Sequence, residues 1–262
     1  MEREYWLRQA QGKPLFPDLE WSRPENKQYA GKLLIAGGNL HGFSAPAEAY
    51  TTAQKAGVGT TRILLPNALQ KTVGRVLENG EYAPSTPSGS FSQKALGELL
   101  ECAAWADGTL IAGDLGRNSE TAILLEKFLS KHRGQVTLTK DAVDYATAAP
   151  DTVLQRPDTL LVLSLSQLQR LAIATKSIKP ITFDMDLLHL VEWLHDFTAQ
   201  HGLNLIVKHH HTILVAAADK ISTTTLANDV SIWRVQTAAQ AVVWWMQFPQ
   251  KQFEALTMAM AS

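Results

Sequence analysis

The chain has 262 residues, 45% of them apolar, and its 24 basic and 25 acidic side chains leave a formal net charge of -1. This balance gives no long-range attraction to nucleic acid or to an anionic membrane, so we expect neither as a partner. The single cysteine, Cys102, excludes an internal disulfide, and no apolar run is long enough to span a membrane, so we expect a protein of the reducing cytoplasm.

The first thirty residues differ from the rest of the chain. They are polar and contain Pro14, Pro17 and Pro24, with aromatic side chains between them. Prolines at this density disfavour a long helix or a central strand. We therefore predict an N-terminal arm over residues 1–30, whose aromatic side chains dock on the body of the chain or on a neighbouring subunit. One α/β domain follows over residues 31–262.

The first unit of regular structure follows the arm. The apolar run 33–36 is typical of a strand that is buried on both faces, and a glycine turn at 37–39 ends it. We predict a helix that Ser44 caps and that Gly57 ends, and then a second strand at 60–65. Strand, helix and strand in this order predict a βαβ unit with parallel strands.

The alternation of strand and helix patterns continues to the C-terminus, where apolar spacing predicts helices and short apolar runs predict strands. The later predicted helices span residues 95–106, 119–132, 186–200, 235–247 and 253–260. The later predicted strands span residues 109–112, 135–138, 159–163, 203–207 and 212–216. The last two strands are expected to form a hairpin. The pattern predicts a three-layer α/β/α sandwich with a mostly parallel sheet, in which ligands bind beyond the carboxyl ends of the strands.

Two glycine turns lie at predicted strand ends. At the turn 37–39, backbone N–H groups and the following helix can hold an anion, although a plain tight turn has the same sequence. In the turn 113–117, Asp114 can accept a hydrogen bond from a hydroxyl group and Arg117 can pair with phosphate. A solvated turn is the alternative at this second position.

The turn of the predicted hairpin carries basic and imidazole side chains. Lys208 follows the apolar run 205–207, and a lysine at the carboxyl end of a strand points toward the ligand crevice, so we expect it to contact phosphate. His209 and His211 share one face of an extended strand, which permits a metal site. No Cys, Asp or Glu stands at a recognisable spacing from them, so we favour a polar turn and expect no metal.

Several short segments resemble one family. Segment 32–39 is similar to its first strand and G-G-[S/N] turn, and segment 53–59 to its A-x-x-A-G-A-G helix end. Segment 111–117 resembles its G-P-G-L-G-R loop, 138–144 its L-D-A-D-A-L-N segment, and 207–213 its L-K-G-x-x-T-V segment. From about residue 32 onward the chain thus resembles the ADP- or ATP-dependent NAD(P)H-hydrate dehydratases, which are carbohydrate-kinase-like members of the ribokinase superfamily.

The resemblance implies a ribokinase-like fold, bound ADP or ATP with Mg²⁺, a nicotinamide nucleotide as second ligand, and a homo-oligomer. Lys208 and Thr212 are the residues implied to bind the adenine nucleotide, and we expect Arg234 to bind its phosphates as well. The positions implied to contact the substrate are Gly37, Gly38, Asn39, Gly113, Asp114, Gly116, Asp141 and Ser164.

The chain departs from the family where the chemistry takes place. Ser164 and Gln167 replace a histidine and an acid, and the family's G-S-G-D anion-hole loop has no glycine counterpart. Without gaps, Gln236 replaces the catalytic aspartate, and an amide cannot act as a general base at neutral pH. A gapped alignment makes Asp229 the base, and Arg234 can replace the anion hole with a guanidinium.

These departures lead to three hypotheses. The first is a nucleotide-binding protein whose dehydratase activity is weak or altered. The second is a catalytically inactive relative that serves in binding or assembly. The third is a small-molecule kinase of the same superfamily.

Overall fold

The computed structural model describes residues 3–74, 80–228 and 233–261, and its strands form one sheet. The strands are β1 (Trp6–Ala10), β2 (Lys32–Gly37), β3 (Thr60–Pro66), β4 (Gly80–Ala83), β5 (Gly108–Gly113), β6 (Gln135–Thr139), β7 (Thr159–Leu163), β8 (Asn204–His209), β9 (Thr212–Ala217) and β10 (Lys220–Thr225). Their order across the sheet is β1-β10-β9-β8-β7-β6-β5-β2-β3-β4. Within these residues only β9 runs antiparallel to its neighbours, so the predicted mostly parallel sheet is confirmed.

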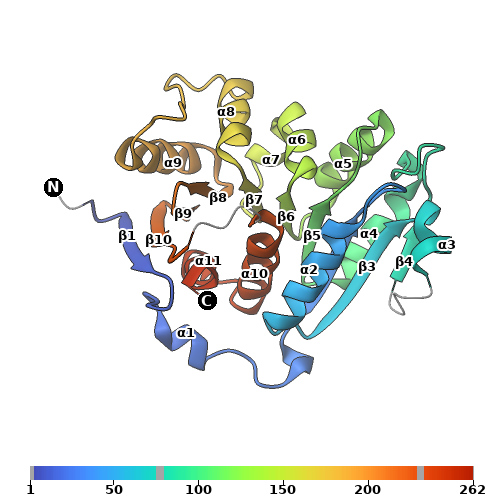
Figure 1. Ribbon diagram of the computed structural model, residues 1–262, viewed down its shortest axis with the longest axis horizontal. Coiled ribbons are helices and arrows are strands. Elements are labelled where there is room, and N and C mark those ends of the chain that lie inside the picture. Colours follow the sequence, from blue (N-terminus) through green and yellow to red (C-terminus); the bar gives the residue numbers. More distant parts are fainter. Residues whose placement is uncertain (1–2, 75–79, 229–232, 262) are drawn as a thin grey trace.

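Helices cover both faces of the sheet. They are α1 (Pro17–Trp21), α2 (Ser44–Lys55), α3 (Gln70–Val73), α4 (Leu96–Trp105), α5 (Ser119–Lys131), α6 (Asp141–Ala148), α7 (Asp151–Leu154), α8 (Leu165–Ala174), α9 (Leu187–His201), α10 (Arg234–Gln247) and α11 (Gln252–Ala261). Figure 1 shows α2, α10 and α11 on one side of the sheet, and α5, α6, α8 and α9 on the other. This arrangement is the predicted three-layer α/β/α sandwich.

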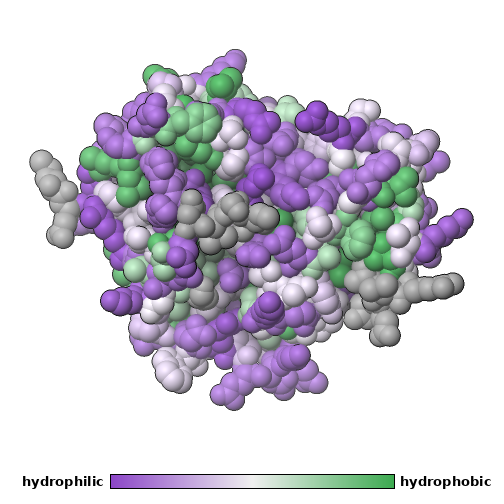
Figure 2. All heavy atoms as spheres, viewed as in Figure 1, coloured by the Kyte–Doolittle hydropathy of each residue, from purple (hydrophilic) through white to green (hydrophobic). Residues whose placement is uncertain are grey.

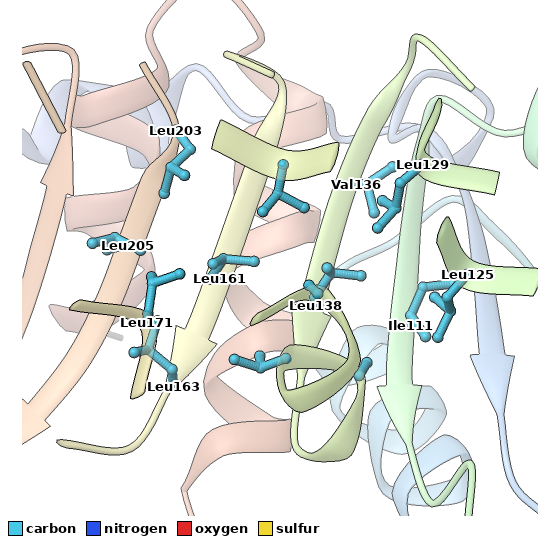
Figure 3. Packing of buried hydrophobic residues seen from close by; sticks show 14 of the residues in the cluster. Ile111, Leu125, Leu129, Val136, Leu138, Leu161, Leu163, Leu171, Leu203 and Leu205 are labelled. Carbon is cyan, nitrogen blue, oxygen red and sulfur yellow. The ribbon is translucent and has the colours of Figure 1, made fainter. Parts of the chain in front are cut away.

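Each face of the sheet has its own apolar core because successive residues of a strand point to opposite faces. Along β2, Leu33 and Ile35 pack with α2, α10 and α11, whereas Leu34 packs on the opposite side. Figure 3 shows leucines from neighbouring strands on this second side, with Leu161 from β7 beside Leu205 from β8. Burying one such side chain stabilises the fold by about 1.5–3 kcal/mol.

The N-terminal arm begins with an edge strand that the sequence analysis did not predict. β1 pairs in parallel with β10, and the prolines of the arm all follow it. The buried Gln9 amide donates to Thr224 Oγ1 at 2.8 Å and to the carbonyl of Thr257 at 2.7 Å, which ties the strand to β10 and α11. Further along the arm, Phe16 packs edge-on against Phe253 of α11. The arm therefore docks on the chain's own body.

The predicted elements between residues 32 and 66 form as expected, with one correction. The helix begins at Ser44, but Ser44 does not cap it: the N-cap position is Phe43, which makes no side-chain cap. Ser44 instead donates its hydroxyl to Asp114 of a neighbouring strand end. The cap was mispredicted because the acceptor for the backbone N–H of Ala45 is the carboxylate of Asp114, a residue far away in the sequence.

The predicted β8–β9 hairpin is also confirmed, whereas short amphipathic elements were missed. His209 ends β8, and the left-handed backbone of His210, with φ of 50°, makes the tight turn into β9. The helices that were not predicted are α1, α3, α6, α7 and α8, and the unpredicted strands include β4 and β10. Most of these elements are short, but α8 is as long as α4 and its buried Leu168, Leu171 and Ala172 lie at helical spacing, so its pattern was overlooked.

Figure 2 shows apolar side chains gathered at the upper left, over α8, α9 and the segment that joins them, while the middle of this face is mainly hydrophilic. Ile173, Ile178 and Phe183 are exposed in this region, Ile178 to 99%. In the described part of the chain, no helix has the length and apolar character needed to cross a membrane.

Candidate ligand site at the carboxyl edge of the sheet

Neighbouring parallel strands end side by side at one edge of the sheet. β8, β7, β6, β5 and β2 are adjacent in that order, and Leu163 of β7 lies level with Val207 of β8. The residues at or just beyond the strand ends therefore share one edge, and they include Lys208, Ser164 and Asp114. In doubly wound sheets this edge is where ligands bind.

Asp114 links three elements at this edge. Its Oδ2 accepts hydrogen bonds from the backbone N–H of Ala45 at 2.8 Å and from the hydroxyl of Ser44 at 3.0 Å, while Lys140 Nζ lies 2.5 Å from its Oδ1. The amide of Asn39 donates to the Asp114 carbonyl at 2.6 Å. Burial raises the pKa of the Asp114 carboxyl, but Lys140, Ala45 and Ser44 together hold the pKa below its ordinary value.

The turns at these strand ends contain unfavourable backbone conformations. Asp114 and Lys140 have φ of 56° and 52°, in the left-handed region that non-glycine residues rarely adopt. Such conformations cost about 1–3 kcal/mol each and cluster at functional sites. The adjacent Gly113 has φ of 101°, and a Cβ there would lie 2.7 Å from the Lys140 side chain.

The two predicted glycine turns touch each other. The backbone N–H of Gly38 donates to the carbonyl of Gly113 at 2.9 Å, and a Cβ on Gly37 would lie 2.5 Å from that same carbonyl oxygen. Glycine at these positions therefore lets one turn approach the other. The approach to a ligand, which the sequence analysis expected of them, stays a prediction.

The Asp141 carboxylate is hydrogen-bonded to the backbone of the turn 113–117. Its Oδ2 accepts from the backbone N–H groups of Leu115 at 2.8 Å and Gly116 at 3.2 Å. Its Oδ1 is buried and has no hydrogen-bond partner among the described residues. Burial raises the pKa of the Asp141 carboxyl and the charge of Asp114 adds to the effect, while the two N–H groups oppose it. One acceptor oxygen at the strand ends is thus left over.

Gln167 is a buried amide whose hydrogen-bonding groups are fully used. Its Nε2 donates to the Lys140 carbonyl at 2.7 Å and to Asp144 Oδ1 at 2.9 Å. Its Oε1 accepts from the Ser164 N–H at 3.1 Å and from Arg234 Nη1 at 2.9 Å. Ser164, predicted to contact substrate, caps α8 in a reciprocal pair with Gln167. An ionised acid at this position could accept from Ser164 and Arg234 but could not donate to Lys140 and Asp144, so an amide fits all four contacts.

The nucleotide-binding candidates lie at two neighbouring elements. Arg234 is the first residue of α10, and its contact with Gln167 places the start of α10 at the carboxyl end of β7. Lys208 and Thr212 are half-buried and flank the β8–β9 turn. Gln236 is exposed in the first turn of α10, and Asp229 lies outside the described residues.

The three consecutive histidines lie at the β8–β9 turn, where His209 ends β8 and residues 210–211 connect it to β9. The rings of His209 and His210 lie 4.3 Å apart in an edge-on arrangement. Across residues 3–74, 80–228 and 233–261, no group of three or more His, Cys, Asp or Glu side chains is placed to hold a metal ion.

A pocket of about 500 Å³ opens beside the strand ends. Residues 116–119, Asp141, Tyr145 and Arg170 contribute to its lining. Another pocket, of about 410 Å³, lies around residues 179–193 at the start of α9 and shares none of these residues. We take the first as part of the candidate site because it contains Asp141.

Comparison with solved structures identifies the fold. A ribokinase-like superfamily protein from Enterococcus faecalis superimposes with a TM-score of 0.76 at 15% identity, covering 100% of this chain and 87% of the other. An ADP/ATP-dependent NAD(P)H-hydrate dehydratase from Bacillus subtilis, co-crystallised with ATP/Mg²⁺, gives 0.64 at 14% identity over 94% of this chain and 85% of that one. A Bacillus subtilis pyridoxal kinase in an ADP complex gives 0.53 at 9% identity over 87% and 88%.

No family model matches the sequence, and a search of curated proteins finds no match. The structural likeness shows that the fold is ribokinase-like, as the sequence analysis expected. Lys140 was not among the residues predicted for the candidate site. The available signal was a charged residue at the end of a strand, at a position where the resembled family pattern has alanine.

Proposed function

We propose that this protein binds an adenine nucleotide at the carboxyl edge of its sheet, with the phosphates between Arg234 and Lys208. The observation that carries the proposal is the position of Arg234. It starts α10, and the buried amide of Gln167 holds its guanidinium at the end of β7.

The N-terminus of α10 has the groups that bind a phosphate. α10 has 14 residues, and the N–H groups and dipole at the N-terminus of such a helix attract an anion. A guanidinium grips phosphate oxygens in pairs. The side-chain partner described for Arg234 is the neutral amide of Gln167, so this contact does not cancel the charge of the guanidinium.

Lys208 adds a second cation from the adjacent strand. It follows Val207, which lies level with Leu163, so its backbone is beside the start of α8 where Gln167 lies. Mg²⁺ would enter with the nucleotide and be held mainly by its phosphates, as this ion commonly is. The nucleotide-bound Bacillus subtilis dehydratase, which has the same fold, is consistent with this assignment.

For catalysis we propose dehydratase activity that is weak or altered. The aligned residue Gln236 is an exposed amide, and neither it nor Arg234 can accept a proton as a carboxylate base does. The second hypothesis, a catalytically inactive protein that serves in binding or assembly, requires the same nucleotide site. A small-molecule kinase would need a base, and the described carboxylate with an unpartnered oxygen at the strand ends is Asp141.

The test is thermal unfolding with ATP, ADP or AMP, for the wild type, Arg234→Ala and a control, Arg133→Ala. Arg133 is exposed just beyond the end of α5. A nucleotide at a hundred times its Kd stabilises the native state by about 2.7 kcal/mol. We expect Arg234→Ala to weaken binding about tenfold or more, because a hydrogen bond to a charged group is lost. Arg133→Ala should bind as the wild type does. The absence of any shift with millimolar adenine nucleotide would refute the proposal.

A further inference from the structure

The N-terminus of α2 lies at the same edge of the sheet as the proposed nucleotide site, beside the end of β5. α2 has 12 residues, and its N-terminus is a favourable place for an anion. In this protein the anion at the N-terminus of α2 is a side chain of the protein, the carboxylate of Asp114. The Asp114 carboxylate accepts from the first turn of the helix, at 2.8 Å from the Ala45 nitrogen and 3.0 Å from the Ser44 hydroxyl.

Lys140 completes this internal arrangement. Its ammonium lies 2.5 Å from the other oxygen of Asp114, and the two side chains are only 31% and 15% exposed. Both residues hold left-handed backbone conformations at neighbouring strand ends. In the quoted motifs of the resembled family these two positions are glycine and alanine, so the ion pair is a feature of this chain.

One buried acceptor atom is left over beside this arrangement. Asp141 Oδ1 is buried with no partner among the described residues, and it would lie 3.0 Å from a Cβ at Gly113. Asp114, Asp141 and Lys140 together bring two carboxyl groups and one ammonium close to one another. A hydroxyl or an amine can donate to such an oxygen, whereas a phosphate brings only further negative charge.

We infer that Asp114 is a specificity-determining residue that closes the N-terminus of α2 to phosphate, so that a second ligand at this end presents hydroxyl or amine donors. The identity of the first ligand rests on the proposed nucleotide site, but the closure itself does not. A nicotinamide nucleotide would have to keep its phosphates away from α2, which is in line with the weak or altered dehydratase activity that we propose.

The test counts bound inorganic phosphate by isothermal titration calorimetry. Asp114→Gly suits the left-handed backbone, because glycine adopts positive φ at no steric cost. It removes the carboxylate and leaves the Ala45 N–H, the Ser44 hydroxyl and the Lys140 ammonium around one space. We expect this variant to bind one more phosphate per chain than the wild type. Asp114→Asn, which retains an acceptor for Ala45, should bind no additional phosphate.

Removing the ammonium as well, in Asp114→Gly/Lys140→Ala, should weaken the additional site about tenfold or more. The inference is overturned if the folded Asp114→Gly variant and the wild type bind the same number of phosphates. It is also overturned if the additional site is indifferent to Lys140. ATP is titrated in parallel. A failure of every variant to bind ATP refutes the nucleotide site, while the phosphate count still decides the role of Asp114.

Discussion

Gln167→Glu replaces the buried amide with a carboxylate of the same shape, and we expect it to lower both stability and nucleotide affinity. The amide nitrogen donates to the Lys140 carbonyl and to Asp144, at 2.7 and 2.9 Å. A carboxylate has no hydrogen to donate, so both contacts become approaches between oxygen atoms. The contact with Arg234 becomes an ion pair instead, which neutralises the charge that we assign to phosphate.

The magnitude follows from these contacts. Two lost hydrogen bonds cost about 1–3 kcal/mol in total, and the like charge of Asp144 adds to this cost. The new pair with Arg234 offsets part of it. The expected net loss is about 2 kcal/mol, which lowers Tm by roughly 4–8 °C in a chain of this size. Because the new carboxylate at position 167 forms an ion pair with the guanidinium of Arg234, ATP should bind about tenfold more weakly.

The assay is urea and thermal unfolding, with and without ATP, for the wild type, Gln167→Glu and the control Gln200→Glu. Gln200 is exposed on α9, so its substitution adds the same charge without burying it. If Gln167→Glu unfolds within about 0.5 kcal/mol of the control, the usual scatter of surface changes, and binds ATP as the wild type does, the reasoning is wrong.

Three further predictions concern pH, assembly and catalysis. The pKa of Asp114 lies below its ordinary value, so its stabilising contribution is present above about pH 4 and is lost as pH falls through the folded-state pKa. The stability difference between wild type and Asp114→Asn in urea should therefore shrink in acid, and a constant difference would contradict this. Exposed apolar residues in the arm, with Trp21 at 89% and Tyr29 at 76%, together with the patch around Ile178, predict a homo-oligomer, and a monomeric mass by light scattering at micromolar concentration would exclude it. Dehydration of hydrated NADH with ADP or ATP should be slower than in a competent enzyme by roughly 10²–10⁴-fold, because the base is lost. Robust turnover that Asp229→Asn abolishes would instead make Asp229 the base.

The sequence predicted the sandwich because long periodic segments carry most of the fold. Apolar runs at 33–36 and 159–163 form central strands that are buried on both faces, and such strands need no partner information to be recognised. Edge strand β1 was missed because it is short and half-buried, and its stability depends on Gln9 reaching β10 and α11.

The position of the candidate site could be predicted from the sequence, while the roles of its residues stay predictions. Glycine turns and a lysine at strand ends located the edge of the sheet, but the partners of each side chain depend on tertiary contacts. The pairing of Asp114 with Ser44 and Lys140 joins residues that are 70 and 26 positions apart. The contact of Gln167 with Arg234 spans 67 positions. Such contacts leave no local pattern in the sequence.

The central claim is that nucleotide phosphates bind at the N-terminus of α10, and a crystal structure with ATP and Mg²⁺ tests it most directly. We expect a phosphate group within about 4 Å of the Arg234 guanidinium, with Lys208 on its other side. A phosphate group seated instead at the N-terminus of α2, with Asp114 displaced, would contradict both the nucleotide site and the role assigned to Asp114.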